Sequence, residues 1–442
     1  MANSKEMSPV ATDETTTAKF VVPDLTVKDL LSAIPPHCFE RSFLHSSLYL
    51  VGDFVAIGAL LWTAQTYIPF IDPQYISLPH PILYGAARFA AWGAYTFAAG
   101  LLFMGLFVLG HECGHQAYST SKTANNTVGL LVHSFIGVPY HAWRISHAKH
   151  HAQTSHLTCD QAFVPATRSE WGLPALDTEK ENLEGTMVTS DLQEIFEEVL
   201  EYSPIKSIVW LFGQLFFGWP MYLINNAKGQ RSYPAWTNHF TPRGPIFAPH
   251  QYRDIIISDI GVGIWFAAVV YSCIHYGFIN VFRAYLGPWF WYCHWLVFIT
   301  YQQHTDPALP HYAATSFTFP RGALSTFDRE LMGGPGIFGR ICNYICATAT
   351  HGICETHVAH HVCSKIPHYH AWAAKAALDK RLHEEGIYLQ GRPATWSEAY
   401  RIFNECKFIE DEGEVRFYKN AQGKAATVAV FSDSVADSGV EL

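Results

Sequence analysis

Three short histidine clusters, widely separated along the chain, constrain the fold more than any other feature. They read HECGH at residues 111–115, HAKHH at 147–151 and HVAHH at 357–361. On a helix, residues three and four positions apart share one face, so HxxHH places one imidazole a turn below two others. Each cluster therefore predicts a helical stripe of imidazoles, and we expect the fold to bring the three stripes together.

The number of imidazoles favours a site for two metal ions. Imidazole suits iron, zinc, copper or nickel, whereas carboxylate and carbonyl oxygens suit magnesium and calcium. One zinc ion takes about four ligands, so eight histidines are too many for it. Two metals would leave positions open for a reactant. A ninth histidine, in QQHTDP, directly follows the last apolar run and could reach the same site. The candidate ligands are His111, His115, His147, His150, His151, His304, His357, His360 and His361.

The composition indicates a membrane protein with sizeable polar parts. Charged residues make up 15% of the 442 residues, against about 25% in ordinary soluble proteins. The 13 Trp, 22 Tyr and 30 Phe fit apolar helices with aromatic belts at the membrane surfaces. The net charge of −9 argues against a nucleic-acid partner. The ten cysteines suggest no disulfide framework, so the polar parts are expected in the cytosol.

Five apolar runs indicate an all-α integral membrane protein. About 20 apolar residues suffice for one bilayer crossing. The third histidine cluster can meet the first two only if an even number of runs cross between them. We therefore expect four transmembrane helices in two hairpins, capped by a cytosolic helical domain that holds the histidines. The expected crossings are 47–68, 82–110, 255–279 and 285–301, while 205–224, with its Gly218-Trp219-Pro220 break, is expected to be only membrane-associated.

Positive charge places the clusters on the cytosolic side. Lys and Arg residues precede the first run and follow the second, but the connection 69–81 has none, and positive residues tend to stay cytoplasmic. Three polar residues inside apolar runs carry a weak functional signal: Asp53, Asp259 and His275. The expected division is a disordered tail over 1–22, a membrane domain over 23–410 and a polar tail over 411–442.

The histidine motifs and their surroundings resemble those of the membrane-bound fatty-acyl desaturases. The likeness covers roughly residues 23–410 and is strongest to the fungal microsomal Δ12 (oleate) desaturases. It is carried by IPPHCFERS, HECGHQAYSTSKTANNTVG, VPYHAWRISHAKHH, VFITYQQHTDPALPHY and HVAHH followed by SKIPHYHA. These matches are long and specific.

The resemblance implies an enzyme that uses a non-haem di-iron centre and O2 to insert a cis double bond at Δ12 of lipid-bound oleoyl chains. The eight cluster histidines match the family's metal-binding positions, and His304 matches its additional histidine. The sequence holds neither the HPGG motif of a fused cytochrome b5 domain nor a Rossmann-type glycine fingerprint. The resemblance therefore implies that a separate cytochrome b5 and its NADH-dependent reductase supply electrons, and that the protein resides in the endoplasmic-reticulum membrane.

Several alternatives remain open. Within the family, the outcome could be ω3 desaturation, combined Δ12 and ω3 desaturation, hydroxylation or formation of a triple bond. HECGH also satisfies the HExxH motif of zinc proteases, in which Glu112 would act as the base. A metal transporter is the non-enzymatic alternative, although its ligands would lie inside the membrane spans rather than at their cytosolic ends.

Overall fold

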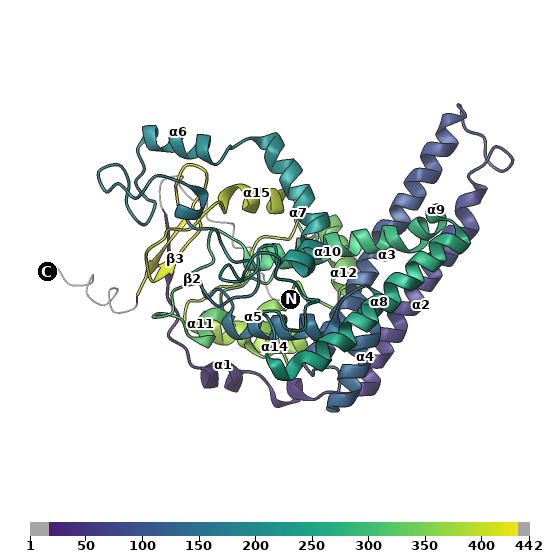
Figure 1. Cartoon of the computed structure of the whole chain (residues 1–442), viewed down its shortest axis with the longest axis horizontal. Coiled ribbons are helices and arrows are strands. Elements are labelled where there is room, and N and C mark those ends of the chain that lie inside the picture. The colour runs from purple at the N-terminus through teal and green to yellow at the C-terminus, as the bar shows by residue number, and fades with distance from the viewer. Residues whose placement is uncertain (1–16, 432–442) are drawn as a thin grey trace, which may run out of the picture.

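Two long helices form an antiparallel hairpin that projects from the rest of the molecule (Figure 1). They are α2 (Phe43–Tyr67) and α3 (Ile82–Gly114), seen in a computed structural model that describes residues 17–431. The Ser46 hydroxyl donates to the Tyr118 carbonyl, which ties the start of α2 to the chain just beyond α3. With 33 residues, α3 extends about 50 Å, longer than the roughly 30 Å hydrocarbon core of a bilayer.

A second hairpin is formed by α8 (Tyr252–Tyr276) and α10 (Gly287–His304). The connection between them is the short helix α9 (Phe278–Val281) and a π-helical turn over Phe282–Leu286. Near its start, α8 is held to the histidine-bearing part of the chain because the Ser258 hydroxyl accepts from the His141 backbone N–H at 2.8 Å. Since α10 ends on His304, the hairpin leaves from and returns to the same end of the molecule, as the sequence predicts.

Four helices of the described chain are long and apolar enough to cross a membrane, but one of them differs from the sequence-based set. They are Phe43–Phe70, α3, α7 (Pro204–Asn225) and Pro249–Tyr276. Helix α7, which we expected to be only membrane-associated, is thus long and apolar enough to cross. Helix α10, which we expected to cross, is not among the four.

The polar composition of α10 explains why it is omitted, because its 18 residues include two histidines and two glutamines. Its Gly287 lies against Thr96, and its Pro288 carbonyl lies beside Gly100, so α10 begins near the middle of α3 and accompanies only its second half. The helix packs between α3 and α7 and buries polar residues including Gln302 and Gln303. The predicted break in α7 is also absent, because the helix continues through Pro220.

The remaining helices surround the ends of these hairpins where the histidines lie. They are α1 (Val27–Ala33), α4 (Lys122–Phe135), α5 (Tyr140–Gln153), α6 (Ser190–Val199), α11 (Phe319–Ala323), α12 (Gly336–Ala349), α13 (His357–Val362), α14 (His368–Glu384) and α15 (Trp396–Glu405). The largest core cluster joins α3, α7 and α10 through residues such as Phe107, Trp219 and Trp295. This core fixes the ends of α3 and α10, which carry His111 and His304.

Both ends of the described chain carry β-structure where the sequence predicted tails. Strand β1 (Ala18–Val21) pairs in parallel with β4 (Thr427–Val430), and β2 (His311–Tyr312) pairs antiparallel with β3 (Val415–Arg416). The rings of Phe20 and Phe417 meet edge to face, and the buried Lys419 ammonium contacts Glu410 at 2.6 Å. These buried contacts require ordered ends, so the boundaries at 22 and 411 are wrong within the described residues. The rest of both expected tails, 1–16 and 432–442, lies outside those residues.

Candidate metal centre

The structure brings all nine candidate histidines together from four segments. His111 lies in the last turn of α3, and His115 directly follows that helix. Helix α5 supplies three histidines, α13 supplies three more, and His304 is the last residue of α10. All six residues of α13 and eight of the 14 residues of α5 are buried, so the imidazoles are presented by packed helices rather than by loops.

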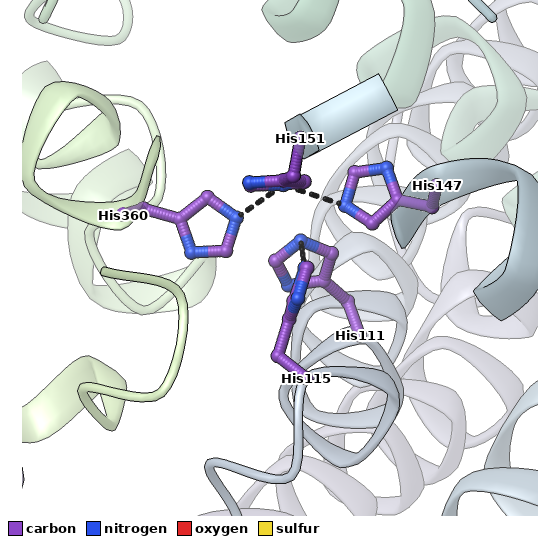
Figure 2. A group of neighbouring side chains, drawn as sticks. All are labelled: His111, His115, His147, His151 and His360. Atoms are coloured by element: carbon purple, nitrogen blue, oxygen red, sulfur yellow. Dashed lines mark hydrogen bonds between the residues drawn. The ribbon is translucent and has the colours of Figure 1, made fainter. Parts of the chain in front are cut away.

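Five of the imidazoles form one compact group, shown in Figure 2. One nitrogen of each lies within 4.8 Å of one nitrogen of every other member. Within the group, the Nε2 atoms of His111 and His115 are 3.2 Å apart, and His151 Nε2 lies 3.1 Å from the Nε2 atoms of both His147 and His360. We call His111, His115, His147, His151 and His360 the five-histidine group.

The other four imidazoles form a second group beside the first. His150, His304 and His361 satisfy the same criterion of 4.8 Å. His357 completes the group, because its Nε2 atom lies 2.9 Å from that of His304 and 3.1 Å from that of His361. We call His150, His304, His357 and His361 the four-histidine group.

Helical spacing explains how the clusters divide between the groups. The i,i+4 pairs His111/His115 and His147/His151 stay together in the five-histidine group, and His357/His361 stays together in the four-histidine group. The middle histidine of each HxxHH cluster, His150 or His360, lies about 60° around the helix from the first and joins the opposite group. The two HxxHH helices therefore each serve both groups and tie them together.

The nitrogen positions fit a pair of metal ions. Ligand nitrogens about 2.0–2.1 Å from a metal and at right angles to each other are separated by about 3 Å. Six Nε2–Nε2 pairs within the two groups are separated by 2.9–3.4 Å. A neutral imidazole has one N–H, so His151 and His357, each facing two other Nε2 atoms, cannot satisfy every contact by hydrogen bonding. Metal ions would satisfy all of them.

Burial keeps these imidazoles in the neutral form that binds metals. Removal from water, reinforced by neighbouring imidazoles, holds the pKa values of His147, His151, His357 and His361 well below the usual range. Burial likewise lowers the pKa of His115 to about 3. Because a metal must displace the proton from a charged imidazole, a site that is already neutral near pH 7 is prepared for binding.

The structure reveals supporting residues that we did not identify from the sequence. Asp160 accepts from His150 Nδ1 at 2.6 Å and from the Ser155 backbone N–H at 2.7 Å, so it fixes the ring with Nε2 facing the site. Asp328 accepts from the Val358 backbone N–H at 2.8 Å and thereby holds the start of α13. The nearness of Asp160 to HAKHH was an available signal, whereas Asp328 lies 29 residues before His357 and gave none.

Glu112 does not occupy the position of a protease base. Its carboxylate accepts from the His368 backbone N–H at 2.9 Å, at the start of α14, and it belongs to neither histidine group. It therefore connects α3 to α14.

Among the polar residues in apolar runs, Asp53 is buried in α2 and contacts His351 Nε2 at 2.9 Å. That contact ties α2 to the turn that precedes the third cluster.

An apolar cavity reaches imidazoles of both groups. Its walls include Met104 and Phe107 of α3, Trp219 of α7, and Leu296 and Val297 of α10. Histidines from both groups line the same cavity: His111, His147, His150, His304 and His357. The arrangement can hold a long apolar molecule against the two histidine groups.

Apolar helices of membrane-spanning length and a buried set of imidazoles define the class, a multi-pass membrane protein with a histidine-rich metal site. The family profile described as "Fatty acid desaturase" matches residues 87–393. A Delta(12) fatty acid desaturase of Mortierella alpina is 41% identical over 94% of this chain and 96% of its own length. Its counterpart in Mortierella isabellina is 42% identical, covering 90% and 92%. An oleate hydroxylase of Claviceps purpurea is 33% identical, covering 95% and 86%. The chain belongs to the fatty acid desaturase family, and it is an oxidoreductase.

Proposed function

We propose that this protein is an O2-dependent acyl-lipid desaturase that inserts a cis double bond at Δ12 of oleoyl chains to give linoleoyl chains. The observation that carries the proposal is the apolar cavity that ends on imidazoles of both histidine groups. The high identity to Delta(12) fatty acid desaturases along almost the whole chain supports the position of the double bond.

The nine histidines would hold two iron ions. One turnover would convert a –CH2–CH2– unit, O2, two electrons and two protons into –CH=CH– and two molecules of water. The iron centre supplies the chemistry of O2 activation that an unactivated C–H bond requires. The chain's own residues bind and orient the substrate: apolar side chains of α3, α7 and α10 hold the acyl chain and exclude water.

Aromatic contacts keep the ligand rings in place at the cavity wall. Trp143 stacks on His147, with ring centroids 4.6 Å apart, and Phe163 stacks on His304 at 5.7 Å. Both aromatic residues line the cavity. They therefore cover one face of each imidazole while leaving its Nε2 atom directed at the site.

The decisive experiment is expression in a yeast that lacks polyunsaturated fatty acids, followed by mass spectrometry of its lipids. We expect linoleate to accumulate at the expense of oleate. Hydroxy-oleate as the main product would instead indicate the reaction named for the Claviceps purpurea relative, and α-linolenate would indicate ω3 activity. Either result would remove the Δ12 assignment but keep the family.

We further propose that cytochrome b5 and its NADH-dependent reductase supply the electrons, and that the protein resides in the endoplasmic-reticulum membrane with the histidines in the cytosol. Blocking cytochrome b5 reduction should then stop conversion of oleate.

A glycosylation acceptor placed near Pro73, in the α2–α3 connection, should be modified, and one near Lys180 should not. Modification near Lys180 would contradict the cytosolic placement of the site.

A further inference from the structure

The two histidine groups differ in their access to the protein surface. Of the nine histidines, only His115 and His147 are partly exposed, and both belong to the five-histidine group. His115 is also absent from the cavity wall. Electron transfer between proteins slows steeply with distance, so a donor must approach where the ligands come nearest to solvent. The exposed edges of His115 and His147 mark such a place.

Cationic side chains flank this place on two sides. The Arg41 guanidinium donates to the Gln116 carbonyl at 3.1 Å, directly beside His115. Arg144 of α5 lies against Gly114, since a Cβ built on that glycine would be 3.6 Å from Arg144 Cγ. Arg144 has only a distant carboxylate partner, Asp254 at 3.5 Å. These cations are a local exception in a chain of net charge −9.

The solvent-facing side of α5 carries small side chains one and two turns beyond Arg144. Ala148 and Ala152, one turn apart on α5, are exposed, and their small side chains allow another protein to come close to the helix that carries His147. The neighbouring Lys149 donates to the Ile246 carbonyl at 2.7 Å and adds a third positive charge. We define Arg41, His115, Arg144, Ala148 and Lys149 as the α5 surface.

We propose that the α5 surface is the docking site of the electron donor, an acidic one-electron carrier protein whose negative charges face Arg41, Arg144 and Lys149. Opposite charges would steer the encounter and orient the donor. The exposed alanines would let its redox group approach His147, from which each electron would pass to the metal centre. This proposal rests on the proposed function, because it locates the donor of the two electrons that each double bond requires.

A charge series at Ala148 tests the proposal. The position is exposed and helical, so Ala148→Glu, Ala148→Lys and Ala148→Gln differ in charge while all add a flexible side chain. For each variant in lipid vesicles containing oleoyl phospholipid, product formation is measured with the reduced haem domain of cytochrome b5 and, separately, with reduced methyl viologen. The ratio of the two rates isolates the donor interaction from folding, metal loading and chemistry.

At low ionic strength we expect this ratio to fall about 3- to 10-fold for Ala148→Glu relative to Ala148→Gln, with no fall for Ala148→Lys. Added salt should bring the three variants together, because screening weakens the attraction. Lys380→Glu, an exposed change on α14, should keep the wild-type ratio. Equal ratios for Ala148→Glu, Ala148→Gln and Ala148→Lys at low salt would overturn the docking site. Failure of the wild type to form product with either donor would overturn the proposed function itself.

Discussion

The two histidine groups are built from the same motifs but stand in different surroundings. The five-histidine group has two partly exposed members, His115 and His147, whereas every member of the four-histidine group is buried. The four-histidine group has side-chain supports instead: His150 Nδ1 contacts Asp160 at 2.6 Å, and His361 Nδ1 contacts the Thr154 hydroxyl at 3.2 Å. Buried Nδ1 atoms without a protein partner occur in both groups, at His111 and His151 in the five-histidine group and at His304 and His357 in the four-histidine group.

This difference indicates two ways to orient a ligand. In the four-histidine group, hydrogen bonds to Nδ1 fix two of the four rings, those of His150 and His361, as is common for metal-binding histidines. In the five-histidine group, packing against neighbouring side chains contributes more to the orientation of the rings, as in the stack of Trp143 on His147. Changes to the helices that serve both groups, α5 and α13, should therefore affect both groups equally. Changes to the supporting side chains Asp160 and Thr154 should affect the four-histidine group alone.

The largest effect is expected from removing a ligand from either group. His147→Ala and His360→Ala in one group, and His150→Ala and His357→Ala in the other, should each leave less than about 1% of wild-type desaturation, because loss of a ligand exceeds the 10- to 100-fold cost of losing a supporting contact. Linoleate is measured by mass spectrometry, and immunoblots of membranes check that the protein accumulates. Nearly normal product from two or more variants would contradict the two-metal assignment.

A slightly smaller effect is expected from His304→Gln. An amide oxygen is a poor replacement for imidazole at iron, so most activity should disappear and the iron content per chain should fall, with the amount of protein in the membrane nearly unchanged. A residue with a purely structural role would tolerate this change, because Gln keeps a hydrogen-bonding group at a similar reach. Wild-type turnover and iron content in His304→Gln would therefore remove this histidine from the four-histidine group's ligands.

An intermediate effect is expected from Asp160→Asn, which tests the contrast between the groups directly. The variant keeps the shape of the side chain but loses the charge that holds His150 Nδ1, so activity should fall about 10- to 100-fold. Iron binding should weaken, as measured by iron content after dialysis against a chelator. Asp191→Asn, at an exposed carboxylate paired with Lys180, is the matched control and should behave as wild type. An equal response of the two variants would show that Asp160 does not support the ligand.

The smallest effect is expected from Glu112→Gln. Its carboxylate accepts a backbone N–H at the start of α14, and a glutamine amide oxygen can accept the same bond. We expect a loss of stability of about 1–2 kcal/mol and desaturation within about 5-fold of wild type, measured by thermal inactivation and product formation. Complete loss of activity in folded, iron-loaded protein would instead assign Glu112 a direct chemical role.

The sequence by itself determined which histidines come together, the helical character of the motifs and most of the apolar helices. These features are local: HxxxH and HxxHH fix neighbouring imidazoles through the 3.6-residue period of a helix, and long apolar runs identify helices of membrane-spanning length. The α8–α10 hairpin followed from a short connection between two apolar runs. The same reasoning was wrong at both ends of the described chain, where β1 pairs with β4 across more than 400 residues.

Only the tertiary structure decided how the ligands are divided and supported. His147 and His150 lie on one helix but belong to different groups, because α3 brings His111 to His147 whereas α10 brings His304 to His150. The same packing creates the cavity between α3, α7 and α10, buries α10, and brings Asp160 onto His150. Such outcomes depend on crossing positions of helices that are distant in sequence, and no local period along the chain encodes where those crossings fall.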